Sequence, residues 1–173
     1  PEISVGIDLG TTNSCAYYYI NNSYECVKHQ GSRLFPSFVE YYEDKITIGK
    51  QAKLHFGRSN NVVRNMKRII GRFYDSKEVT ESLDYCGVPV VAKNNKPYFR
   101  IASRNTDYSP SDVCAEILKE IKKAIQDKTE CTIGDVVVTI PANYNNNQRQ
   151  ATRDAIATAG FNMNRVKLLN EPS

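Results

Sequence analysis

The sequence predicts an α/β fold built on a mixed β-sheet, with a smaller α+β segment inserted between its parts. Residues 3–10 alternate apolar with small or polar side chains, which is the period-two pattern of a strand. Two further β-rich runs follow them as a meander. Near the other end, a strand, a helix and a strand form a β-α-β unit, which predicts parallel strands joined by a right-handed crossover.

The first part of the chain predicts the meander and then a hairpin. Residues 15–20 and 24–29 predict its second and third strands, separated by an Asn-Asn-Ser turn. Residues 37–42 and 46–48 predict a hairpin closed by Glu-Asp-Lys. On the first strand, one face gathers four apolar side chains, Ile3, Val5, Ile7 and Leu9.

The middle of the chain predicts a helix and a second hairpin. Residues 61–70 place five apolar side chains at helical spacing, and Gly71 follows as a stop signal. The stretch 89–103, with Asn94 and Asn95 inside it, predicts the hairpin.

The last third predicts a capped helix followed by the β-α-β unit. Ser109 is a cap residue, Pro110 occupies the first helical position and Asp112 the third. Beyond this helix we expect a strand buried on both faces, a helix and a last strand, at 135–141, 146–159 and 165–170.

Composition excludes several classes of protein. The 173 residues are 40% hydrophobic and 24% charged, as in ordinary globular domains, so disorder and low complexity are ruled out. No apolar run approaches the roughly 20 residues of a membrane helix, and no membrane association is expected. Five scattered cysteines without a C-x-x-C pair favour a reducing compartment over a disulfide framework.

The net charge of +4 is a mild bias without a basic tail. Nucleic-acid binding would require a stripe of Lys and Arg, so no nucleic-acid partner is expected. The densest basic group is Arg64, Lys67, Arg68 and Arg72. For Arg64 we expect a solvated position on a helix face.

Asp8 to Asn13, with the sequence Asp-Leu-Gly-Thr-Thr-Asn, form the first candidate site. The backbone N–H groups of a tight glycine turn bind anions, and a nearby carboxylate binds Mg²⁺ directly or through water. Because Asp, Gly, Thr and Asn are also common turn residues, a plain hairpin is the alternative interpretation.

Lys67 and Glu171 are the other candidates. A lysine beside a phosphate neutralises developing charge and orients water. Glu171, like Asp8, stands at the carboxyl end of a predicted strand, where open α/β sheets bind ligands. Taken singly, each also fits a plainer role, as a solvated cation or a strand end. The Walker, dinucleotide-binding, zinc-protease and nucleophile-elbow motifs do not occur in the sequence.

Five collinear blocks resemble the heat shock protein 70 (DnaK-type) chaperone family. They are Gly6 to Cys15, Lys67 to Arg72, Val138 to Ala142, Gln148 to Thr152, and Leu169 to Pro172. The resemblance runs along essentially the whole chain and covers about the first half of that family's nucleotide-binding domain. It implies an incomplete domain: an actin-like (ribonuclease H-like) ATPase lobe with a core subdomain at 1–36 and 110–173 and a smaller inserted subdomain at 37–109.

The resemblance also implies an activity and partners. The full-length protein would hydrolyse ATP to ADP and couple that cycle to the binding of unfolded polypeptide clients. Its partners would be J-domain co-chaperones and nucleotide exchange factors. The cellular location would be the cytoplasm, or an organelle lumen if a leader was removed. This chain by itself is expected to be nearly inactive.

The matching blocks assign the functional residues of the family to positions in this sequence. The resemblance implies that Asp8 and Glu171 hold hydrated Mg²⁺ and position the attacking water, and that Lys67 is the catalytic lysine. The phosphates would be bound by the first glycine turn, at Gly10, Thr11, Thr12 and Asn13, with Thr11 also in the catalytic set. The switch pair would be Pro141 and Arg149, and the J-protein and linker face would include Lys167, Asn170 and Ser173.

Four positions depart from the family pattern, namely Asn143, Asn146, Lys167 and Ser173. None touches the expected phosphate chemistry, so the departures bear on regulation rather than catalysis. Two other functions stay open: a sugar or metabolite kinase of the same superfamily, and a nucleotide-independent interaction module from a truncated gene.

Overall fold

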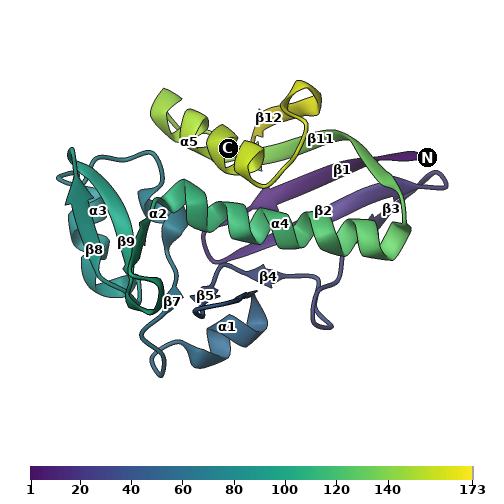
Figure 1. Cartoon of the computed structure of the whole chain (residues 1–173). Coiled ribbons are helices and arrows are strands. Elements are labelled where there is room, and N and C mark those ends of the chain that lie inside the picture. The colour runs from purple at the N-terminus through teal and green to yellow at the C-terminus, as the bar shows by residue number, and fades with distance from the viewer. Residues whose placement is uncertain (173) are drawn as a thin grey trace.

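The computed structural model describes residues 1–172 and is organised around a six-stranded mixed sheet (Figure 1). Five strands follow one another across it in the order β12-β11-β1-β2-β3, and β4 (Phe35–Pro36) pairs with the end of β2. Their bounds are β1 (Glu2–Leu9), β2 (Asn13–Ile20), β3 (Ser23–Cys26), β11 (Thr132–Ile140) and β12 (Val166–Asn170). β1 is antiparallel to β2 and parallel to β11, which is parallel to β12. The predicted mixed sheet and parallel β-α-β unit are confirmed.

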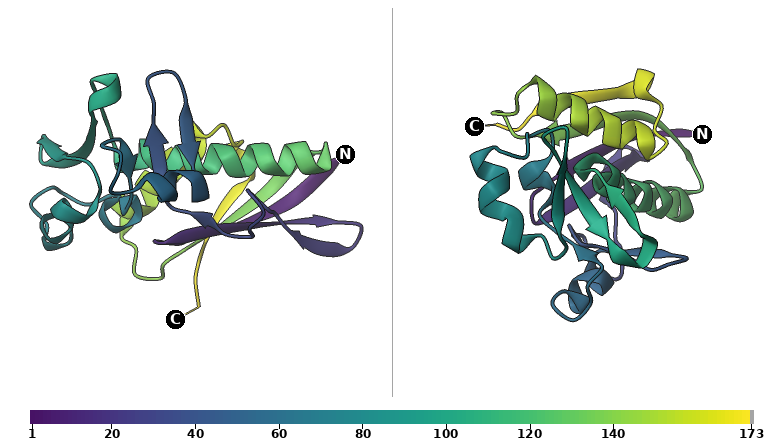
Figure 2. Two further views of the ribbon diagram at one scale, coloured as in Figure 1. Left: turned by 90° about the horizontal axis from the view of Figure 1, so that it is seen from below. Right: turned by 60° about the vertical axis from the view of Figure 1, so that its left-hand side comes forward.

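Two helices, α4 (Pro110–Thr129) and α5 (Asn146–Thr158), cover one face of this sheet (Figure 2). The alternating apolar side chains of β1 are all buried there, and α4 contributes Val113, Ile117, Leu118, Ile121 and Ile125. Within residues 1–172, no helix lies over the opposite face (Figure 2). Asp8 points to that open face, because it alternates with the buried positions Ile7 and Leu9.

The segment between β4 and α4 holds two small sheets. The first, in the order β6-β5-β7, contains β5 (Val39–Tyr41), β6 (Ile46–Ile48) and β7 (Val62–Val63). The second, in the order β10-β9-β8, contains β8 (Val90–Lys93), β9 (Lys96–Ile101) and β10 (Thr106–Tyr108). Three short helices accompany them, α1 (Lys50–His55), α2 (Met66–Ile69) and α3 (Lys77–Ser82). One continuous hydrophobic core runs from the main sheet into both small sheets.

The helix expected over 61–70 is wrong in its first half. Val62 and Val63 form β7, which pairs with β5, because two adjacent β-branched residues fit a sheet better than a helix. Asn65 then adopts a left-handed conformation with φ of 65°, so the helix begins only at Met66. Arg64 therefore precedes the helix, and its Nε donates to the Tyr85 carbonyl at 2.7 Å. Its expected place on a solvated helix face is a further error.

Other boundaries also differ from expectation. The third meander strand ends at Cys26, three residues early. The strand expected at 135–141 begins at Thr132, and its second face is half-exposed at Val137 and Thr139 rather than buried, since no helix lies over it within the described part of the chain. The cap at Ser109 is confirmed: its hydroxyl accepts from the Asp112 N–H at 3.0 Å, and the Asp112 carboxylate accepts from the Ser109 N–H. Among residues 1–172, no helix has the length and apolar character to span a membrane.

Candidate functional site

The carboxyl ends of three parallel strands bring two acidic residues together. Asp8 of β1 is paired in register with Thr139 of β11, whose hydroxyl donates to Asp8 Oδ1 at 3.2 Å. Glu171 follows β12 directly, and its N–H donates to the Ile140 carbonyl at 2.8 Å. Residues separated by more than 130 positions along the chain thus meet at one edge of the sheet, as the parallel topology requires.

The surroundings of Glu171 raise the pKa of its carboxyl group. Partial burial raises it above the ordinary value of a glutamate, and hydrogen bonding to Asp8 together with the Asp8 charge raises it further. The positive charge of Lys67 acts in the opposite direction. Two carboxylates that share a site in this way are stabilised when a cation is placed between them.

The turn between β1 and β2 is the first predicted anion site. A Cβ atom at Gly10 would collide with the Asn13 carbonyl oxygen, so the turn closes this tightly only with glycine at that position. Ser37 braces it from outside, with its N–H donating to the Thr12 carbonyl at 2.9 Å and its hydroxyl to the Gly10 carbonyl at 3.4 Å. Thr11 and Thr12 are exposed, and Asn13 begins β2.

Lys67 is a buried lysine whose ammonium group has no hydrogen-bond partner among residues 1–172. The residue is only 6% exposed. Its Nζ atom lies over the Tyr144 ring, 4.9 Å from the centroid. Burying an unpaired ammonium is costly, and an aromatic face recovers only part of that cost. An anion bound next to this ammonium would therefore supply the missing interaction.

Lys67 and Thr11 line the same cavity, which has a volume of about 650 Å³. Pro141, Asn143 and Tyr144 form another part of its wall. The remaining lining residues are mostly charged or polar and come from the segment between Arg64 and Tyr85. This cavity adjoins two of the predicted site elements, the glycine turn and Lys67.

The other predicted residues lie around the same edge of the sheet. Arg149 of α5 donates from Nη2 to Asn170 Oδ1 at 2.5 Å, so the structure pairs this predicted switch residue with a residue of the predicted linker face. Lys167 is exposed on β12. Asn146 is the first residue of α5. Ser173 lies outside the described residues.

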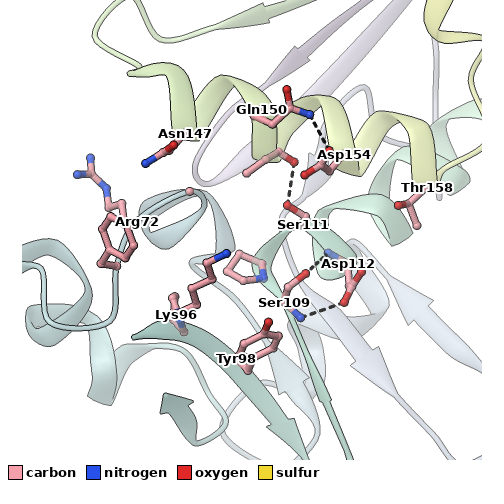
Figure 3. Close-up of a pocket in the computed structure, with 15 residues that line it drawn as sticks. Arg72, Lys96, Tyr98, Ser109, Ser111, Asp112, Asn147, Gln150, Asp154 and Thr158 are labelled. Carbon is pink, nitrogen blue, oxygen red and sulfur yellow. Dashed lines mark hydrogen bonds between the residues drawn. The ribbon is translucent and has the colours of Figure 1, made fainter. Parts of the chain in front are cut away.

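A separate cavity of about 490 Å³ lies between α4, α5 and the loop 71–73 (Figure 3). Lys96 and Tyr98 of β9 face Ser109 and Ser111 at the start of α4 across it (Figure 3). Within the described chain, none of the acidic, glycine-turn or lysine positions predicted from sequence lines this cavity.

Comparisons with known proteins agree with this arrangement. A family profile described as Hsp70 protein matches residues 4–173. The chain belongs to the Hsp70 family. The chaperone protein DnaK of Psychrobacter cryohalolentis is 37% identical over 172 residues, which is 98% of this chain and 26% of that protein. The chain therefore spans about a quarter of the length of this relative, and its α/β fold is that of an Hsp70 actin-like ATPase lobe fragment.

Three residues that support this candidate site were missed by sequence reasoning. Thr139 positions the Asp8 carboxylate, Ser37 braces the glycine turn, and Tyr144 lies beneath Lys67. Thr139 falls within a motif block, but a hydroxyl in a strand gives no signal of its own. Ser37 and Tyr144 become visible only once the fold brings distant segments together.

Proposed function

We propose that this chain is the part of an Hsp70 ATPase that binds the phosphates of ATP or ADP together with Mg²⁺. The observation that carries the proposal is the buried Lys67 ammonium, which has no hydrogen-bond partner among residues 1–172 and lines a cavity with Thr11. The glycine turn, which tolerates no Cβ, and the close pair of carboxylates fit the same ligand. Membership of the Hsp70 family supports it independently.

Each residue has a chemical role in this proposal. Bound Mg-ATP supplies the phosphoryl group whose transfer to water is the reaction. Asp8 and Glu171 hold the hydrated cation and orient the attacking water, while Thr139 keeps the Asp8 carboxylate in place. The N–H groups of the turn at Gly10–Thr12, with the hydroxyls of both threonines, hold the phosphates. Lys67 stabilises the charge that develops on the phosphoryl oxygens.

The test is the Lys67→Ala variant of a full-length protein that contains these residues. Because other groups hold the ground-state phosphates, ATP affinity should stay nearly unchanged, while the single-turnover hydrolysis rate falls by about 10²–10³-fold. An unchanged rate would remove Lys67 from the catalytic set. Transfer of the phosphoryl group to a sugar instead of water would indicate a kinase.

We further propose that the full-length protein couples this ATPase to client polypeptides under the control of J-domain co-chaperones and nucleotide exchange factors. Family membership supports the coupling. Pro141 and Arg149 would relay the nucleotide state, and the exposed residues Lys167 and Asn170 would belong to the docking face.

Lys167→Arg tests that docking face. An arginine offers a carboxylate two parallel hydrogen bonds where a lysine offers a point charge, so J-stimulated turnover should rise while basal turnover stays the same. The comparison requires steady-state ATP hydrolysis with and without a J-domain protein. Equal changes in both rates, or no change in either, would contradict a docking role for Lys167.

A further inference from the structure

Gly71 follows the helix that carries Lys67 and contacts the first turn of α5. The contact is so close that it leaves no room for a side chain at position 71. Its φ of 70° lies in the left-handed region that favours glycine. A Cβ atom there would lie 2.5 Å from Gln148 Cα and 2.7 Å from Gln148 N, both of them backbone atoms. The approach of the two segments therefore depends on glycine for its conformation and for its space.

The Gln148 side of the contact is held rigidly. The Gln148 N–H donates to Asn145 Oδ1 at 2.9 Å, and Gln148 Oε1 accepts from the Asn145 N–H at 3.0 Å. The Gln148 carbonyl accepts from the buried hydroxyl of Thr152 at 2.8 Å, and Gln148 itself is only 3% exposed. A backbone fixed at both its N–H and its carbonyl does not yield to an intruding methyl group, so a displacement must fall on the Gly71 side.

The beginning of α5 touches the proposed site at two further points. Before the helix, Tyr144 lies beneath the Lys67 ammonium. Directly after Gln148, Arg149 donates to Asn170, the residue that precedes Glu171. Figure 3 shows Arg72 and Asn147, which are the chain neighbours of Gly71 and Gln148 and both line the cavity between α4 and α5.

We propose that Gly71 is a positioning residue, whose contact with the Gln148 backbone sets the place of Lys67 against Tyr144. Because the first turn of α5 is held rigidly, any side chain at position 71 would displace the helix that carries Lys67. The expected effect on the hydrolysis rate rests on the proposed function of Lys67, whereas the expected effect on the position of its side chain does not.

The test compares Gly71→Ala with Gly57→Ala in the 173-residue chain. Gly57 is the matched control, because its φ of 84° carries the same backbone strain while nothing lies within 4 Å of its added Cβ. The readout is the NMR shift of the Lys67 side-chain methylene protons next to Nζ, which the Tyr144 ring current displaces upfield. We expect this displacement to be lost in Gly71→Ala and kept in Gly57→Ala. A folded Gly71→Ala chain with the Lys67 shift unchanged would overturn the proposal.

If Gly71→Ala does not fold, Asn145→Ala gives the same information. It leaves Gly71 intact but releases the Gln148 N–H from its cap, so the Lys67 shift should move partway in the same direction. No movement in that variant would also overturn the proposal.

A catalytic readout separates this proposal from the proposed function. In the full-length protein, Gly71→Ala should slow the single-turnover step by about 10²-fold, the cost of a misplacement of about 1 Å, with ATP affinity nearly unchanged. An unaffected Lys67→Ala variant would defeat the proposed function and leave the NMR result standing. Suppose instead that Lys67→Ala hydrolyses ATP slowly, and that Gly71→Ala displaces Lys67 without changing the hydrolysis rate. The Gly71 contact would then have no effect on catalysis.

Discussion

Lys67 lowers the stability of the fold, and the proposed function depends on the same ammonium group. Its ammonium is buried and has no hydrogen-bond partner within residues 1–172, with only the Tyr144 ring against it. Such a group lowers the stability of a fold unless a ligand completes its environment. The sequence placed Lys67 in a basic cluster, and only the fold distinguishes it from Arg68, which is exposed, and Arg72, which pairs with Glu78 at 3.2 Å.

Lys67→Met should therefore stabilise the chain. Methionine has a similar volume and removes the buried charge, so the free energy of unfolding should rise by about 1–3 kcal/mol in urea titrations without nucleotide. Lys123→Met is the control, since that lysine is exposed and pairs with Asp127 at the surface. A loss of stability in Lys67→Met would contradict the claim that the ammonium is uncompensated.

The elements predicted well are those whose local signals agree with their tertiary contacts. α4 has a cap, a first-turn proline and an apolar stripe, and it forms as predicted. β7 fails because the helical spacing of Val62 and Val63 competes with pairing to β5, a contact between segments more than 20 residues apart. The short helices α1 and α3 have too few turns for a periodic pattern, and their positions follow from packing.

The hydrogen-bonded contact between β5 and α1 predicts how the stability of the fold depends on pH. Glu40 of β5 is 3% exposed, with Oε1 lying 2.5 Å from His55 Nδ1 and accepting from the Tyr42 hydroxyl at 2.9 Å. Burial alone would raise the pKa of Glu40, but the hydrogen bonds from His55, Tyr42 and Ser59 outweigh it and lower the pKa. A carboxylate with a lowered folded pKa stabilises the fold above its unfolded pKa, and that stabilisation is lost as the pH falls through the folded value.

Glu40→Gln should thus cost about 1–2 kcal/mol of unfolding free energy at pH 7. The difference from the parent chain should shrink once the pH falls below about 4.3, the ordinary pKa of a glutamate. Urea unfolding at a series of pH values measures it. Glu43→Gln, at an exposed position in the neighbouring turn, should show no such dependence. A difference that persists unchanged into acid would mean that the Glu40 charge plays no part in this contact.

At the scale of the whole molecule, chain topology assembles the site. The β-α-β unit predicted from sequence places Glu171 at the end of β12, and the parallel pairing of β1 with β11 brings Asp8 to the same edge of the sheet. The contact of Gly71 with Gln148 and the bond from Arg149 to Asn170 could not be predicted, because they depend on how α5 packs rather than on any local pattern. Asp8 is also exposed to solvent, which screens its charge. We therefore expect weak, Mg²⁺-dependent binding of ATP to this chain and negligible turnover.

Mapping Mg-ATP onto the 173-residue chain by backbone NMR tests the central claim most directly. The account predicts saturable, Mg²⁺-dependent shifts at Gly10–Asn13, Lys67 and Glu171, which Asp8→Asn weakens. Shifts confined to the cavity of Figure 3, around Lys96 and Ser109, or no saturable shifts at any concentration of Mg-ATP, would contradict it.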